Sequence, residues 1–197
     1  MGDQVRLDRR RAVFLDRDGV LAEAIVRADG KSYAPTRVED FVLVPEAPAQ
    51  VQRLRDAGFV CIVFTNQPEL ANGELASSDL DAMHRTMRAA IPLDDVYVCP
   101  HDKSEGCRCH KPATGLLDDA AARWDVDLAT SFVIGDRWRD IGAGRAAGCY
   151  SILLDRPYSA CEVADARAQT LTEAVEMVLR LAAPTATSRA DQPRSGV

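Results

Sequence analysis

The chain has 197 residues, of which 47% are hydrophobic and 27% are charged, as in an ordinary globular protein of one domain. The formal net charge of −6 argues against a general nucleic-acid binder, because such proteins carry a basic face. No apolar run approaches membrane-spanning length, and the N-terminus lacks the apolar core of a signal peptide. We therefore expect a cytoplasmic monomer that acts on a small molecule, with no nucleic-acid or membrane partner.

Strand-like and helix-like segments alternate along the chain. Short apolar runs predict strands at Ala12–Leu15, Phe59–Phe64, Asp95–Val98, Ser131–Ile134 and Tyr150–Leu154. Helical patterns predict helices at Ala47–Ala57, from Ser77 or Ser78 to Ala90, and at Leu116–Trp124, Trp138–Ala147 and Thr170–Leu181. Repeated strand–helix units with short connections predict a three-layer α/β sandwich of the Rossmann-like type, in which helices cover both faces of a central parallel sheet.

The segments between and after these elements complete the predicted organisation. Leu21–Asp40 lacks a strong period and predicts a loop or a small hairpin. Residues 182–197 are rich in Pro, Ser, Thr and Ala and are expected to be disordered, which leaves a single domain over residues 1–181. Residues typical of helix starts stand before three of the helices, namely Pro45, then Ser77 or Ser78, then Thr170 with Glu173 as a capping box.

Two carboxylates follow the first predicted strand. Asp16 and Asp18 are two residues apart, and strand geometry points such residues to the same side. Gly19 then lets the backbone turn away without a Cβ penalty. Carboxylates this close repel each other unless a cation shares the site, and oxygen ligands at a strand end suit magnesium. The alternative interpretation is a strand followed by a solvated, aspartate-rich turn.

Polar residues also follow the other predicted strands. Because the carboxyl ends of parallel strands share one edge of the sheet, we expect these residues near the first two carboxylates. They are Thr65, Asn66, Lys111, Asp136 and Asp140. Such a set suits phosphoryl transfer, since a lysine and a hydroxyl can hold phosphate oxygens while carboxylates serve as nucleophile, acid and base. Taken singly, each has an ordinary alternative as a helix cap, a surface charge or a dipole partner.

The same segments resemble the four motifs of the haloacid dehalogenase-like (HAD) phosphohydrolases. They are Asp16-x-Asp18-Gly19, Thr65-Asn66, Lys111-Pro112 and Gly135-Asp136-x-x-x-Asp140. The resemblance covers residues 13–154 and implies the HAD fold, with Asp16 as the nucleophile and Asp18 as the general acid and base. It also implies that Thr65 and Lys111 contact the phosphate.

A catalytic magnesium ion is expected at the same edge. Asp16, Asp136 and the main-chain carbonyl of Asp18 are its predicted ligands, and Asp140 is predicted to support the site. The ion would offset the charge of the phosphate.

A second constellation follows the third predicted strand. Cys99, His101, Cys107 and Cys109 bring three thiols and one imidazole into one short loop, a set that suits structural, tetrahedral zinc. The alternatives are a disulfide, which the cytosol disfavours, or unrelated cysteines. We interpret the remaining thiols as structural and His84 as an ordinary helix residue; these thiols are Cys61, Cys149 and Cys161.

A zinc loop that runs into Cys-x-Cys-x-Lys-Pro resembles the histidinol-phosphate and D-glycero-D-manno-heptose 1,7-bisphosphate phosphatases of this family. The chain leaves no room for a separate cap domain, because the segments Leu21–Asp40 and Cys99–Cys109 are both short, so we expect a capless enzyme. Among substrates, the resemblance favours first the heptose bisphosphate, from which the 7-phosphate would be removed, and second histidinol phosphate. Arg137 is the first candidate to contact a second phosphate or a polar substrate tail, and Asn66 and His110 are weaker candidates.

Two departures bear on that substrate. The branch usually carries Arg where this chain has His110, and an imidazole does not reproduce a bidentate guanidinium contact to phosphate. It also tends to carry Gly-Ile-Ala-Arg-Gly where this chain has Pro68–Gly73, which loses an Arg and gains Glu69. Both changes weaken the case for a bisphosphate. The rival functions are a catalytically idle module that binds a phosphorylated partner, and a nucleic-acid 3′-phosphatase, which the acidic charge disfavours.

Overall fold

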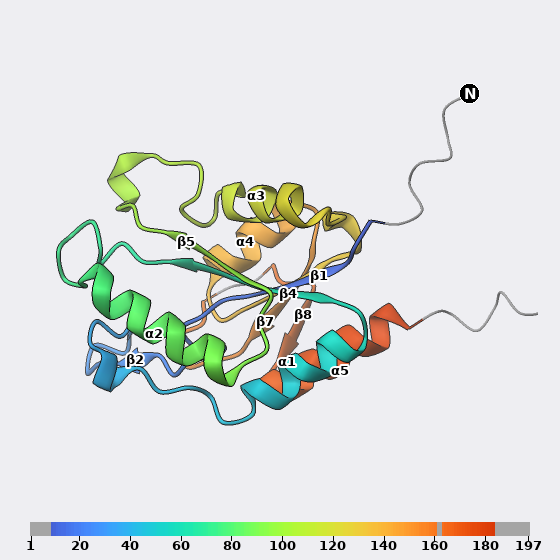
Figure 1. The fold of residues 1–197 in the computed structure, drawn as a ribbon, viewed down its shortest axis with the longest axis horizontal. Helices are drawn as coiled ribbons and strands as arrows, with labels where there is room; N and C mark the ends of the chain where they lie inside the picture. Colours follow the sequence, from blue (N-terminus) through green and yellow to red (C-terminus); the bar gives the residue numbers. More distant parts are fainter. Residues whose placement is uncertain (1–8, 161–162, 184–197) are drawn as a thin grey trace, which may run out of the picture.

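The central sheet has six parallel strands in the order β5-β4-β1-β6-β7-β8 (Figure 1). The computed structural model describes residues 9–160 and 163–183. The strands are β1 Ala12–Leu15, β4 Val60–Asn66, β5 Asp95–Cys99, β6 Phe132–Gly135, β7 Tyr150–Leu154 and β8 Ala166–Ala168. Strand β1 pairs with β4 on one side and with β6 on the other. The strand ends that carry the predicted site residues therefore lie next to one another.

Helices cover both faces of this sheet (Figure 1). One face carries α1 Ala47–Asp56, α2 Ser77–Ala90 and α5 Leu171–Ala182, and the other carries α3 Gly115–Trp124 and α4 Trp138–Ala146. Side chains of β1 point alternately to the two faces of the sheet. Val13 and Leu15 pack toward the first group of helices, while Ala12 and Phe14 pack toward the second. The predicted three-layer α/β sandwich is confirmed.

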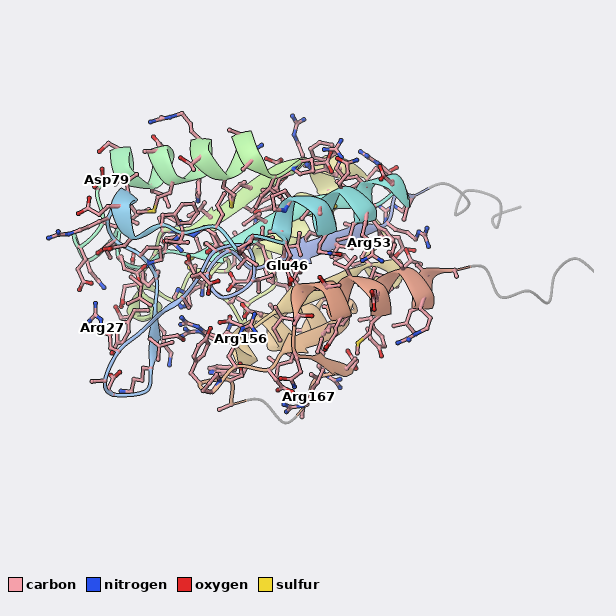
Figure 2. All side chains as sticks on the ribbon, turned by 90° about the horizontal axis from the view of Figure 1, so that it is seen from below. Arg27, Glu46, Arg53, Asp79, Arg156 and Arg167 are labelled. Carbon is pink, nitrogen blue, oxygen red and sulfur yellow. The ribbon has the colours of Figure 1, made fainter. Side chains whose placement is uncertain are left out.

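Helices α1 and α5 lie side by side, and Figure 2 shows Arg53 between them. The Thr172 amide donates a hydrogen bond of 3.2 Å to the Glu46 carboxylate at the start of α1. Arg53 Nη1 lies 4.0 Å from Glu176 Oε1, and both side chains are exposed, so this ion pair adds little stability. Apolar packing against the sheet holds the two helices in place.

All five predicted strands and all five predicted helices are present, with ends that shift by one or two residues. Strand β8 was not predicted, since its three residues Ala166–Ala168 give too short a pattern; it extends the sheet beside β7. Strand β4 runs on through Thr65 and Asn66, so neither residue is a helix cap. The disorder predicted from residue 182 is wrong for Ala182, which ends α5, and residues 184–197 lie outside the described ranges.

Two of the predicted helix starts are wrong in detail. The N-cap of α2 is Ala76, because the chain stays extended only up to that residue and both serines are already helical. Helix α1 begins after Pro45, with a different proline in its first turn. The Thr170 cap is confirmed, since its hydroxyl accepts a hydrogen bond from the Glu173 amide at 3.1 Å. The Glu173 carboxylate accepts from the Gln169 amide at 2.7 Å, not from the Thr170 amide that a capping box requires.

Only short insertions stand beside the carboxyl edge of the sheet in the described part of the chain. Ile25–Val26 (β2) and Ser32–Tyr33 (β3) form the small antiparallel hairpin that was one of the two predictions for this region. Short turns η1 Val38–Asp40, η2 Lys103–Glu105 and η3 Leu128–Thr130 complete the elements. Neither the hairpin nor the cysteine-rich loop forms a cap domain. No helix in residues 9–160 and 163–183 has the length and apolar character needed to cross a bilayer.

Candidate active site

Two neighbouring strands deliver the central carboxylates. Asp16 directly follows β1, and its amide donates to the Ile134 carbonyl of β6 at 3.0 Å, while Asp136 directly follows β6 itself. Gly19 has φ +94°, and a Cβ there would lie 2.0 Å from Asp136 Oδ2. Glycine is therefore required here both by the backbone conformation and by the close approach of the second aspartate.

A buried lysine neutralises part of this acidic cluster. Carboxylate oxygens of Asp16, Asp136 and Asp140 all lie within 4.8 Å of one another. Lys111 Nζ donates to Asp16 Oδ1 at 2.7 Å and to the Phe64 carbonyl at 2.9 Å, and it lies 2.6 Å from Asp140 Oδ1. Burial opposes the charge of Lys111, but Asp140 and Asp16 hold its pKa above the usual value. Lys111 is therefore a fixed cation beside Asp16.

Asp136 gives the clearest indication that this cluster can bind a cation. Its side chain is fully buried, and neither carboxylate oxygen meets the geometry of a hydrogen bond with a described residue. The Tyr158 hydroxyl lies nearby, and burial together with the Asp136 carboxylate raises the pKa of that hydroxyl. Burial and the nearby charges of Asp16 and Asp140 raise the pKa of Asp136 to about 8. Oxygen atoms that are buried, acidic and unpaired fit a hard divalent ion, so this donor set suits magnesium.

Asp18 is held apart from the cluster by a residue that the sequence analysis missed. Arg17 is fully buried and donates to both carboxylate oxygens of Asp18, each at 2.9 Å. Gln67 Nε2 also donates to Asp18 Oδ2 at 3.0 Å and to Thr65 Oγ1 at 3.0 Å. His84, predicted to be ordinary, lies 3.4 Å from Arg17 Nη1. In the sequence, the signal for this contact was the charged Arg17 between Asp16 and Asp18.

The site opens into a cavity of about 230 Å³. Every predicted catalytic and substrate residue lines it, whereas Asp136 is fully buried and is not among the lining residues. The lining residues are Asp16, Asp18, Ser32, Tyr33, Ala34, Thr65, Asn66, Pro68, Glu69, His110, Lys111, Arg137, Arg139 and Asp140. The hairpin residues 32–34 and Arg139 were not predicted, because nothing in their local sequence marks them. Their place depends on how the hairpin folds over the sheet edge.

The three predicted substrate contacts also have structural partners. Asn66 Oδ1 accepts from the Lys111 amide at 3.0 Å, and its Nδ2 donates to the Lys111 carbonyl at 3.3 Å. His110 Nδ1 lies 3.1 Å from the His101 carbonyl. Arg137 Nη2 donates to the Ser32 carbonyl at 3.1 Å. Asn66 therefore positions the backbone of Lys111, while Arg137 ties the hairpin to the site.

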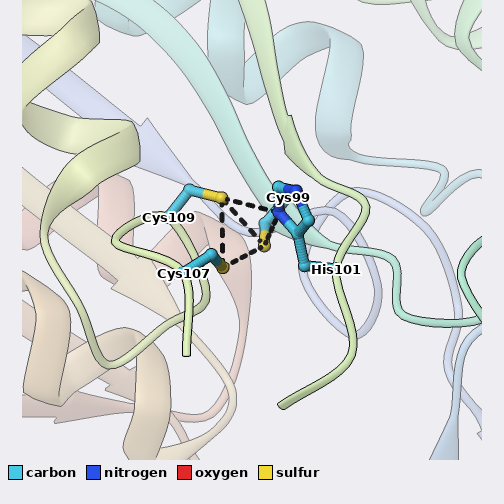
Figure 3. Close-up of side chains that lie close together, drawn as sticks. All are labelled: Cys99, His101, Cys107 and Cys109. Atoms are coloured by element: carbon cyan, nitrogen blue, oxygen red, sulfur yellow. Dashed lines mark hydrogen bonds between the residues drawn. The ribbon is translucent and has the colours of Figure 1, made fainter. Parts of the chain in front are cut away.

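The four predicted zinc ligands gather in one cluster (Figure 3). Sγ of Cys109 lies 3.1 Å from Sγ of Cys99, 3.4 Å from Sγ of Cys107 and 3.2 Å from Nδ1 of His101. Tetrahedral zinc with bonds of about 2.3 Å to sulfur needs ligand atoms about 3.8 Å apart, so a small expansion would admit the ion. All four cysteine and histidine side chains suit a closed structural site with no open position.

Taken together, the Rossmann-like α/β fold and the carboxylate site are those of a hydrolase suited to phosphoryl transfer through an aspartate. Residues 108–174 match the family described as HAD-hydrolase-like. The chain is 35% identical over 200 residues to the D-glycero-D-manno-heptose-1,7-bisphosphate 7-phosphatase of Thermosynechococcus vestitus, covering 89% of this chain and 98% of that relative. It is 34% identical over 142 residues to the D-glycero-beta-D-manno-heptose-1,7-bisphosphate 7-phosphatase of Bordetella bronchiseptica, covering 70% of this chain and 76% of that relative.

A solved structure gives the same result. The D,D-heptose 1,7-bisphosphate phosphatase of B. bronchiseptica, complexed with magnesium and phosphate, superposes with a TM-score of 0.75 and 27% identity over 87% of this chain and 99% of that one. The chain belongs to the haloacid dehalogenase-like hydrolases. It is a phosphoric monoester hydrolase of that family, as the sequence predicted.

Proposed function

We propose that the protein removes the 7-phosphate of D-glycero-D-manno-heptose 1,7-bisphosphate through an aspartyl-phosphate on Asp16. The observation that carries this proposal is the buried Lys111 Nζ, 2.7 Å from Asp16 Oδ1, at the base of a cavity of about 230 Å³. Relatives at 34% and 35% identity that carry this activity in their names support the substrate.

Asp16, Asp136 and the main-chain carbonyl of Asp18 would hold magnesium. The ion, when bound, neutralises charge on the phosphate and on the two aspartates. The unpaired, buried oxygens of Asp136 support this assignment. Asp140 is a positioning residue in this proposal, because its carboxylate faces Lys111 and accepts a hydrogen bond from the Arg137 amide at 3.0 Å.

The proposed reaction has two steps. A carboxylate oxygen of Asp16 attacks phosphorus, the bond from phosphorus to the sugar oxygen breaks, and Asp18 gives a proton to the leaving oxygen. Asp18 next takes a proton from water, which attacks the aspartyl-phosphate, releases inorganic phosphate and regenerates Asp16. Lys111 Nζ and the Thr65 hydroxyl hold phosphate oxygens as charge develops.

Zinc has a separate and structural role in this proposal. Cys99, His101, Cys107 and Cys109 would bind it as a closed tetrahedral set. The loop that they fix leads directly into Lys111, whose backbone is also held by Asn66. The described cysteines are all free thiols, which suits a reducing compartment, and we propose the cytoplasm as the location. We also propose that the protein is a monomer with a single domain.

Phosphate release from a panel of sugar phosphates tests the function. The panel contains both anomers of heptose 1,7-bisphosphate, histidinol phosphate and a nucleotide, each with and without magnesium. We expect kcat/KM for one heptose anomer to exceed the other values by at least about tenfold, or roughly 1.4 kcal/mol of transition-state binding. Equal, low rates across the panel would contradict the heptose substrate while leaving the phosphatase chemistry in place.

A further inference from the structure

The turn after β4 brings a carboxylate to the wall of the active-site cavity. Glu69 and Pro68 both line that cavity. Main-chain hydrogen bonds hold the turn, because the Glu69 carbonyl accepts from the Glu74 amide at 2.9 Å and from the Leu75 amide at 3.0 Å. A side chain on a turn that is already ordered loses little conformational freedom when a ligand binds. Glu69 is thus built into the site before a substrate arrives.

Glu69 differs from the other carboxylates that line the cavity. Each of the others contacts a buried cation, either Lys111 or Arg17; they are Asp16, Asp18 and Asp140. The Oε2 atom of Glu69 is also buried, but it meets the geometry of a hydrogen bond with no described residue. A buried oxygen without a partner costs free energy, which a hydrogen-bond donor on a bound ligand would recover.

The surroundings of Glu69 indicate which kind of donor fits. Burial, followed by the nearby charge of Asp18, raises the pKa of Glu69, so the two carboxyl groups lie close enough for their charges to interact. Arg17 also acts on Glu69, but its guanidinium already donates to Asp18 and to Gln67. A further anion would be repelled here, whereas a hydroxyl can donate a hydrogen bond to the free oxygen.

We infer that Glu69 is a specificity-determining residue, whose buried Oε2 accepts a hydrogen bond from a hydroxyl on the carbon next to the one that carries the cleaved phosphate. This inference rests on the proposed function, in which Asp18 protonates the leaving oxygen and the first carbons of the leaving alcohol therefore lie beside Glu69. In the heptose, C6 carries such a hydroxyl next to the phosphate-bearing C7. A site that hydrogen-bonds a substrate hydroxyl rejects an analogue without it, because the polar group of the site is left unpaired.

Removal of the carboxylate and of the hydroxyl, separately and together, provides the test. The variants are Glu69→Ala and Glu69→Gln, with Glu74→Ala as the matched control, since Glu74 is an exposed glutamate of the same turn that does not line the cavity. The substrates form two pairs: heptose 1,7-bisphosphate with its 6-deoxy analogue, and 2-hydroxypropyl phosphate with propyl phosphate. In the unsubstituted protein, we expect loss of the hydroxyl to lower kcat/KM at least about tenfold in each pair. In Glu69→Ala, the same loss should change kcat/KM less than about threefold, because the partner of the hydroxyl is gone. Glu69→Gln keeps an acceptor oxygen and should retain part of the discrimination.

Each other outcome has a distinct meaning. Discrimination that persists in Glu69→Ala, or that is absent from the unsubstituted protein, would overturn the contact. An equal fall of kcat/KM on all four compounds in Glu69→Ala would also overturn it, because Glu69 would then act only through Asp18. If the propyl pair showed the expected pattern and neither heptose compound released phosphate, the proposed substrate would fail and the inference would stand. Hydrolysis of none of the four compounds would overturn both.

Discussion

Two clusters of ligand-like side chains lie near Lys111, and they are built in opposite ways. Asp16, Asp136 and Asp140 come from strand ends and from the first turn of α4, and all three are buried. The sheet, Gly19, Lys111 and the Arg137 amide hold them in place. The Cys and His cluster comes from a loop whose regular structure after Cys99 is a single short turn, η2.

The difference indicates which cluster needs its metal for shape and which needs it for chemistry. Strand pairing fixes the carboxylates, and their cation would serve mainly to bind and activate phosphate. A loop with little hydrogen-bonded structure has no such frame, so the free energy of zinc binding becomes part of the free energy of folding. The two clusters should therefore respond differently to substitution and to chelation.

Replacement of Asp16, the proposed nucleophile, should give the largest effect on activity. We expect Asp16→Asn to lower kcat by about 10³-fold or more, since an amide cannot form the phospho-intermediate. The melting temperature should stay within a few degrees of the original, because the strands that position residue 16 are unchanged. Steady-state kinetics and circular dichroism measure the two quantities; a collapse of stability with retained kcat would reverse the comparison between the clusters.

Removal of zinc should give the largest effect on stability. A zinc-selective chelator, or Cys109→Ser, is expected to lower the melting temperature by roughly 10 °C or more. Omission of magnesium should change the melting temperature by a few degrees at most, although the same omission should abolish turnover. Calorimetry of the same preparation under the two conditions provides the contrast. An unchanged melting curve after zinc removal would contradict the structural role of the cluster.

The clamp on Asp18 should give an intermediate effect. Arg17→Lys keeps the positive charge but loses the two-pronged contact, so we expect kcat to fall about tenfold with a shifted pH profile. Arg37→Lys is the control, because Arg37 forms an exposed ion pair with Glu39 and does not line the active-site cavity. A fall in stability alone, with an unchanged pH profile, would make Arg17 a packing residue only.

His84 should give the smallest effect, seen in the pH dependence of stability. Burial, followed by the nearby Arg17, lowers the pKa of His84 to about 4. The folded state disfavours the charged ring. The contribution of His84 to the free energy of unfolding is therefore present above the unfolded pKa of about 6.5 and is lost as pH falls toward 4. With a reduction for partial exposure, the loss is about 1 kcal/mol. The difference in unfolding free energy between the original and His84→Gln, measured from pH 7 to 4, should show it; a constant difference would contradict it.

The sheet and the clustering of the carboxylates at its edge were predictable because both depend on local patterns. Apolar runs that end in aspartate give strands and site residues together, and parallel strand ends must meet at one edge. The clamp by Arg17, the hairpin wall at Ser32 and the position of Arg139 were not predictable. These depend on which way a side chain turns after the backbone is placed, and a single sequence carries no periodic signal for that. Strand β8 was missed for a different reason, since three residues at a sheet edge are too few for a pattern.

The most direct test of the account is to locate the transferred phosphoryl group. Rapid acid quenching during turnover of heptose bisphosphate labelled at the 7-phosphate, followed by peptide mapping, would identify the residue that carries the label. We predict label on the peptide that contains Asp16, on Asp16 itself, and none in the Asp16→Asn variant. Label on Asp18 or on any other side chain would contradict the assignment of the nucleophile and, with it, the proposed mechanism.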